Sequence, residues 1–195
     1  MNKSGQDPLS NGLLYQTALP LSWESVSDAA TEPLLLAAEE RNERMLQTLI
    51  TLQEHHLEPQ EEEQDRDRDR APELARIEAK LDMLLELVSQ LRPQQEPGEK
   101  RFSLRLGTGG ISWEVKSLPL PKIDESLVLH LQLDERLPKP LELYGRVITV
   151  EKVGDGDAVT LKFTNLGQRV TDLLGKVIFR QHRREIALIR SRPLG

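Results

Sequence analysis

The sequence predicts an α+β protein: a small antiparallel β-barrel with a C-terminal helix, to which two heptad-repeat helices are added as an oligomerisation bundle. Between residues 74 and 91 apolar residues recur at alternating steps of three and four, which is typical of a helix packed lengthwise on other helices. Beyond residue 100 the period changes to two in short segments separated by Gly, Pro and Asp, which is typical of strands. The last thirty residues return to a helical period.

Composition bounds the class of protein. The chain has 195 residues, which suits one domain with an appendage or two small domains. A net charge of −6 gives no reason to expect a nucleic-acid binder, and the absence of Cys excludes disulfides, thiolate zinc sites and cysteine nucleophiles. No apolar run reaches the roughly 20 residues that span a bilayer. The start of the chain lacks the pattern of a secretory signal, so we expect a cytoplasmic protein.

Residues 1–30 are predicted to contain a flexible N-terminus and the first barrel strand. Apolar and polar residues alternate from Leu13 to Trp23, which is the period of a strand. Pro20 cannot donate a backbone hydrogen bond, so it predicts an edge strand or a bend.

Residues 31–57 are predicted to form the first heptad helix. Thr31 is a candidate cap, and Pro33 falls in the first turn, where its missing N–H costs nothing. Asn42 stands at an apolar position of the stripe, and two interpretations remain open: a buried register residue between helices, or a residue that faces water. Four residues of this helix are predicted to carry oligomerisation: Asn42, Met45, Leu49 and Leu52.

Residues 58–73 are predicted to be a charged linker, because mixed charge at this density cannot bury a core. A calcium loop beginning at Asp65 is not expected, since Arg70 and Arg76 occupy the places of its essential Gly and Glu. Residues 74–92 are predicted to form the second heptad helix, which Pro93 would end. Its predicted oligomerisation residues are Leu74, Ile77, Leu81, Leu84, Val88 and Leu91.

The barrel and its closing helix are predicted for residues 101–190. Strands are expected at 102–106, 111–115, 127–133 and from 141 on, with a change of phase at Gly145 that a bulge would produce. Val153 to Ala158 predicts a hairpin turn, and a helix that caps the barrel follows from about Leu166. No arrangement of His, Ser and acidic residues supports catalysis, so we do not expect an enzyme. The pair His55–His56 has no third ligand within a helical turn except Glu58, so we expect no metal site there.

The C-terminal helix is basic, with seven basic and two acidic residues in the last thirty. Such a helix suits an acidic partner, a nucleic acid or a membrane surface. Cations are also favoured at any helix C-terminus by the helix dipole, which is the plainer interpretation.

From Arg101 on, the order of elements resembles the PilZ domain of bacterial cyclic di-GMP signalling. The resemblance rests on the segment FSLRLGTGGISWEV and on the later ELYGRVITVEKV and AVTLKFTNL strands, followed by the closing helix. It is similar in particular to an atypical branch with an oligomerising heptad helix. The resemblance implies a six-stranded barrel, a role in motility, pilus, biofilm or virulence pathways, and cyclic di-GMP as the possible ligand.

The sequence departs from the family's nucleotide-binding motifs. Arg105 and Gly107 stand where the family's turn has Asp or Asn and Ser, and the family's Arg-x-x-x-Arg is not found upstream, where Arg92 and Arg101 are nine apart. The leading hypothesis is therefore a non-enzymatic homo-oligomer, a tetramer, that acts on a protein partner. One alternative is a cyclic di-GMP receptor with a remodelled site, and another is a scaffold whose basic helix contacts lipid or nucleic acid. The remodelled site would comprise Arg101, Arg105, Gly107 and Gly110.

Overall fold

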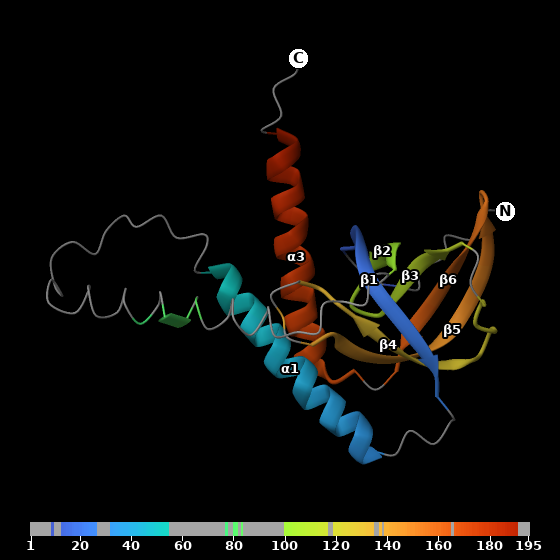
Figure 1. Cartoon of the computed structure of the whole chain (residues 1–195), viewed down its shortest axis with the longest axis horizontal. Helices are drawn as coiled ribbons and strands as arrows, with labels where there is room; N and C mark the ends of the chain where they lie inside the picture. The colour runs from blue at the N-terminus through green and yellow to red at the C-terminus, as the bar shows by residue number, and fades with distance from the viewer. Residues whose placement is uncertain are drawn as a thin grey trace, which may run out of the picture.

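A computed structural model describes residues 9, 13–26, 32–54, 77, 80–81, 83, 100–116, 119–134, 137, 139–164 and 166–190 of the chain. These residues form a β-barrel with two long helices on one side of it (Figure 1). The elements, in chain order, are β1 (Tyr15–Ser25), α1 (Glu32–Glu54), β2 (Arg101–Leu106), β3 (Gly110–Val115), β4 (Ser126–Leu131), β5 (Leu141–Val153), β6 (Gly156–Phe163) and α3 (Gln168–Arg190).

The six strands close into a barrel in the order β1-β2-β3-β6-β5-β4, and every neighbouring pair is antiparallel. The α+β class and the antiparallel barrel predicted from the sequence are confirmed. The N-terminal strand belongs to this barrel although residues 26–100, which include α1, separate it from β2. Closure leaves no strand of the barrel with a free edge along its whole length.

Pro20 marks the point where β1 changes partner. Residues 15–20 pair with β2, and residues 21–25 pair with β4 on the other side of the strand. Pro20 lacks an N–H, but its carbonyl oxygen accepts a hydrogen bond from the Gln132 N–H at 3.1 Å. The prediction of a bend is consistent with this position, whereas an edge strand is wrong, because β1 closes the barrel.

The bulge predicted at Gly145 lies elsewhere in β5. The β5–β6 register shifts between Val147 and Thr149. Glycine is needed at position 145 for close packing. A Cβ there would lie 2.1 Å from Leu161 Cδ2 and 2.5 Å from the Lys162 carbonyl oxygen. The predicted hairpin is confirmed, with Val153 paired to Gly156 across Gly154, whose φ is +57°.

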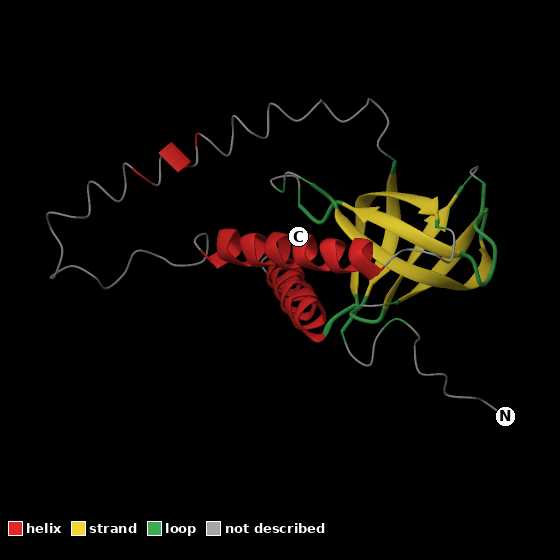
Figure 2. Ribbon diagram, turned by 90° about the horizontal axis from the view of Figure 1, so that it is seen from below, coloured by secondary structure: helices red, strands yellow, loops and turns green. Residues whose placement is uncertain are grey.

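The core fills the barrel and continues under the helices. Buried residues from all six strands form this core. Trp113 is one of them, and Trp23 is tilted against it with 5.5 Å between the ring centroids. The α3 residues Val170, Leu174, Val177 and Ile178 join the same core, so this helix covers one end of the barrel as predicted. Figure 2 shows both helices on that side of the barrel.

Helix α1 packs on its own barrel and on α3. Its buried residues include Ala38, Asn42, Leu46 and Leu49, and the closest neighbours of the helix are α3 and β5. The buried face of α1 is therefore covered by other parts of the same chain.

Candidate functional site

The two arginines of the predicted nucleotide site lie on the outer face of β2. Arg101 is exposed and Arg105 half-buried, whereas the residues between them that point inward, Phe102 and Leu104, are buried. Four residues along a strand bring two side chains to the same face about 13 Å apart, at 3.3 Å per residue. Arg101 Nη2 donates to the Ala18 carbonyl oxygen at 3.0 Å, which orients this guanidinium along β1.

An Arg-x-x-x-Arg spacing therefore does occur, as Arg101 and Arg105, although the sequence was expected to lack the motif. The expectation concerned the segment directly before β2, where Arg92 and Arg101 are nine residues apart. Residues 84–99 of that segment lie outside the described residues. The observed pair belongs to a strand, so its geometry is fixed by the β1–β2 and β2–β3 ladders rather than by a loop.

The glycine turn after β2 is used for packing. The Gly107 N–H donates to the Gly110 carbonyl oxygen, and the Gly109 N–H donates to that of Leu9, both at 2.9 Å. A Cβ on Gly110 would lie 2.4 Å from the Leu161 carbonyl oxygen. Glycine at 110 thus permits close approach of β3 and β6. Two of the turn's N–H groups are already occupied within the chain.

The first helix is attached to the barrel by Asn42. Its Nδ2 donates to the Glu142 carbonyl oxygen at 2.7 Å, and its Oδ1 accepts from the Glu142 N–H at 3.0 Å. Because β6 begins to pair with β5 only at Gly145, the carboxamide replaces the missing strand at Glu142. Arg41 adds an ion pair, with Nη2 2.7 Å from the Glu142 carboxylate.

Asn42 is only 4% exposed, so the interpretation in which it faces water is wrong. Its role in register between chains stays a prediction, but its carboxamide has partners in its own barrel. The sequence did not single out Glu142 or Arg41. A period-two pattern marks Glu142 as a strand residue, but nothing local relates it to a helix 100 residues earlier.

A second contact joins α1 to the start of α3. The Glu39 carboxylate lies against Gly167, and Glu43 forms an ion pair with Arg169. Acidic groups at a helix N-terminus are favoured by its dipole and its unpaired N–H groups. The small cavity at this junction, lined by Asn42, Tyr144 and neighbouring residues, has a volume of about 10 Å³, enough for about one water molecule.

Four residues of the predicted second heptad helix are described, at positions 77, 80, 81 and 83, and all four are exposed. Ile77 and Leu81, two predicted oligomerisation residues, are 56% and 53% exposed. Leu74, Leu84, Val88 and Leu91, and the linker 58–73, lie outside the described residues. In the first helix Leu49 is fully buried, while Met45 and Leu52 are partly exposed.

Further properties of the described part of the chain concern metal ligands, membrane-spanning helices and carboxyl groups with shifted pKa values. No cluster of three or more His, Asp or Glu residues among the described residues is placed to hold a metal ion. None of the helices formed by the described residues is long and apolar enough to cross a membrane. Hydrogen bonds from the Ser25 hydroxyl and the Lys122 N–H lower the pKa of the Glu125 carboxyl.

Several solved structures are similar to all or part of this chain. A Xanthomonas campestris protein, described as a tetrameric PilZ domain self-assembled via an unusual helical bundle, is 24% identical, with 91% of each chain covered and a TM-score of 0.70. The PilZ domain of YcgR from Escherichia coli, solved with cyclic di-GMP, is 14% identical over 47% of this chain and 79% of that one, with a TM-score of 0.40. The Bacillus subtilis inhibitor of motility is 20% identical over 51% of this chain and 46% of that one, with a TM-score of 0.36.

No curated protein matches the chain. The sequence model of one family does match it, over residues 46–191, and that family is described as the atypical PilZ domain, a cyclic di-GMP receptor. The match covers the last nine residues of α1 and everything from β2 to α3. The chain therefore belongs to the atypical PilZ domain family of cyclic di-GMP signalling proteins.

Proposed function

We propose that the chain is a non-enzymatic regulatory protein that assembles with copies of itself through the helices between β1 and β2. In this proposal its effect comes from contact with a protein partner. We assign that partner to a motility, pilus or biofilm pathway, as the family resemblance implies.

The observation that carries this proposal is the exposure of Ile77 and Leu81. Both are more than half exposed in the single chain, although they share one helical stripe. Burying a large aliphatic side chain contributes about 1.5–3 kcal/mol, so a second copy of the stripe is a favourable cover for it. The description of the Xanthomonas campestris relative as a helical-bundle tetramer supports the same arrangement.

A tetramer fits the width of the stripe. Leu85 and Leu87 add apolar side chains beside the heptad positions, which favours three or more helices over two. Assembly multiplies the barrels, and linked weak contacts can raise overall avidity by about 10²- to 10⁴-fold. A barrel that binds its partner weakly thus becomes effective as part of a tetramer.

The test combines Leu81→Asp with Leu84→Asp in the full chain. Two charges in the stripe should yield smaller species in light scattering, while fluorescence of Trp23 and Trp113 stays that of a folded barrel. The matched control is Met83→Asp, which adds a charge at an exposed residue beside the stripe and should leave the mass unchanged. An unchanged mass in the double variant would reject assembly through these helices.

The second candidate function is cyclic di-GMP binding at Arg101 and Arg105. It is favoured by their common outer face on β2, since guanidinium groups pair with phosphates and guanines. A calorimetric titration of the full chain should give heat that Arg105→Ala abolishes. The control Lys116→Ala, directly after β3, should retain it. Binding unaffected by Arg105→Ala rejects this site. If no heat of binding is measured at several temperatures, cyclic di-GMP binding is rejected and only the protein-interaction function remains.

A further inference from the structure

Helix α3 presents a second face opposite the one that covers the barrel. The core side carries Val170, Leu174, Val177 and Ile178, all buried. On the other side Phe179 is 53% exposed and Ile186 is 37% exposed, although both are large and apolar. Seven residues apart, they lie one above the other on the helix surface.

A cation lies between these two apolar residues. The guanidinium of Arg183 is 5.9 Å from the centre of the Phe179 ring, which is the distance of a cation–π contact. Lys176 precedes Phe179 by three residues and is exposed. The stripe Lys176, Phe179, Arg183 and Ile186 thus alternates basic and apolar side chains at steps of three and four. We call it the outer stripe of α3.

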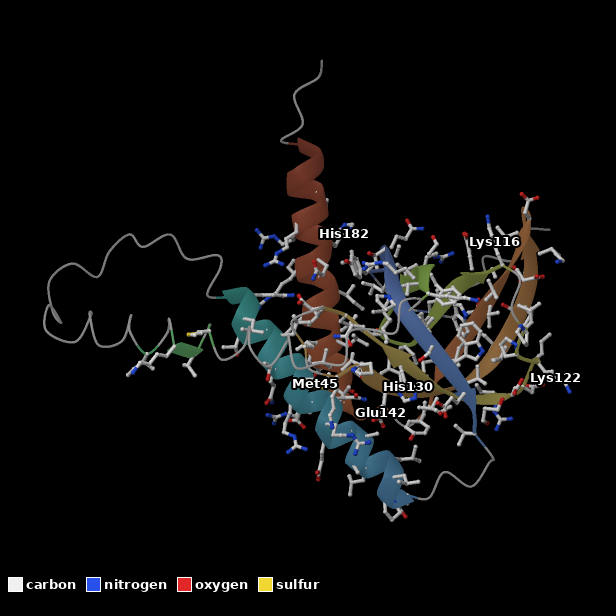
Figure 3. All side chains as sticks on the ribbon, viewed as in Figure 1. Met45, Lys116, Lys122, His130, Glu142 and His182 are labelled. Carbon is white, nitrogen blue, oxygen red and sulfur yellow. The ribbon has the colours of Figure 1, made fainter. Side chains whose placement is uncertain are left out.

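The outer stripe is accessible in the described structure. Beyond its crossing with α1, α3 extends away from the barrel (Figure 1), and Figure 3 shows His182 on this projecting part. Arg180 is engaged by the Ile50 carbonyl oxygen at 3.0 Å. No ion pair joins Lys176 or Arg183 to another described residue.

We propose that the outer stripe docks an acidic amphipathic helix of a partner protein. Apolar residues of such a helix, spaced three and four apart, would cover Phe179 and Ile186, and its carboxylates would pair with Lys176 and Arg183. The partner is a different protein, because a symmetric pairing of two outer stripes would bring like charges together. The proposal extends the protein-interaction function proposed above by giving the partner's chemistry and the surface that binds it.

Two other kinds of partner fit the outer stripe less well. A membrane-surface helix needs a continuous apolar face, whereas the described part of this stripe offers two apolar side chains separated by Arg183. A nucleic acid would pair with the cations but leave Phe179 and Ile186 uncovered, and the net charge of −6 opposes it at longer range.

The test uses a labelled model peptide in fluorescence anisotropy with the full chain. The peptide is a 21-residue helix of Glu and Leu with Leu at steps of three and four, and its scrambled form has the same composition without an apolar face. We expect the helix to bind at least tenfold more tightly than its scrambled form. Phe179→Ser and Arg183→Glu should each weaken binding at least tenfold.

The control is Lys116→Glu, which makes the same kind of change at an exposed residue on the barrel, away from His182 in Figure 3. It should change affinity less than threefold. Equal binding of both peptides, or full affinity in Phe179→Ser, overturns the proposal. So does a preference for phosphatidylglycerol vesicles or duplex DNA over the helix. Light scattering on the same samples tests assembly separately, so failure of one proposal is distinct from failure of the other.

Discussion

At the scale of single residues, Asn42 has the clearest energetic role. Replacing it with Leu removes both bonds to Glu142 and leaves a backbone N–H and C=O unpaired beneath α1. An unsatisfied buried group costs roughly 1–3 kcal/mol, so we expect Asn42→Leu to lower the free energy of unfolding by about 2 kcal/mol or more. Urea unfolding followed by Trp fluorescence measures it.

The neighbouring ion pair provides the control for Asn42. Arg41 and Glu142 have side chains that are 38% and 28% exposed, and ion pairs that remain in contact with water contribute about 0–1 kcal/mol. Arg41→Gln should therefore cost much less than Asn42→Leu. If both variants unfold at the same urea concentration, the carboxamide does not hold the helix to β5.

Gly110 is needed for packing between strands, which is a different role from the ligand binding predicted for it. The sequence suggested it as a ligand residue, but a Cβ there meets the Leu161 carbonyl oxygen at 2.4 Å, and that oxygen belongs to the neighbouring strand. Gly110→Ala should destabilise the barrel by more than Gly154→Ala, whose Cβ meets nothing within 4 Å and whose cost is its positive φ, about 1–2 kcal/mol. Thermal unfolding of the two variants compares them, and an unchanged melting temperature for Gly110→Ala contradicts the packing role.

Glu125 gives a prediction in pH. Its pKa is lowered by the Ser25 hydroxyl and the Lys122 N–H, so its ionised form stabilises the folded state. This contribution is present above the ordinary carboxyl pKa and is lost as pH falls through the lowered one. Ser25→Ala should raise the Glu125 pKa toward its ordinary value in an NMR titration. An unmoved pKa would assign the shift to the Lys122 contact alone.

At the scale of elements, the strands were predictable because their signal is local. Alternation at 102–106 and 111–115, together with Gly-Asp-Gly in the hairpin, depends on residues that are neighbours in sequence. The bulge was predicted at the wrong residue because a glycine within a strand can mark either a bulge or a close approach of another strand. Only the packing of Leu161 against Gly145 distinguishes a bulge from a close approach.

Helix partners were less predictable than helices. A stripe at steps of three and four requires an apolar cover, but it does not say whether the cover belongs to the same chain. Leu49 and Asn42 in α1 are covered by their own barrel and α3, whereas Ile77 and Leu81 are exposed. The apolar stripes of the first and second predicted heptad helices are alike in sequence. The contact between Asn42 and Glu142 that distinguishes the first one joins residues 100 apart, so no local pattern indicates it.

At the scale of the whole molecule, barrel closure depends on a strand outside the matched family segment. Similarity to the family begins at residue 46, yet β1 supplies six residue pairs to β2 and five to β4. A fragment of residues 46–191 would leave β2 and β4 with unpaired edges, lose Asn42 and open the apolar interior. Exposed edges of this kind pair with other chains.

We therefore expect the 46–191 fragment to aggregate or unfold, and the 9–191 fragment to remain folded. Circular dichroism and size-exclusion chromatography distinguish them. A peptide of residues 9–45, added in trans before refolding, should restore the fluorescence of Trp113 in the fragment, because it returns both β1 and the Asn42 contact. If the 46–191 fragment is folded by itself, β1 is an accessory to the barrel. The limits of the family match would then also be the limits of the folding unit.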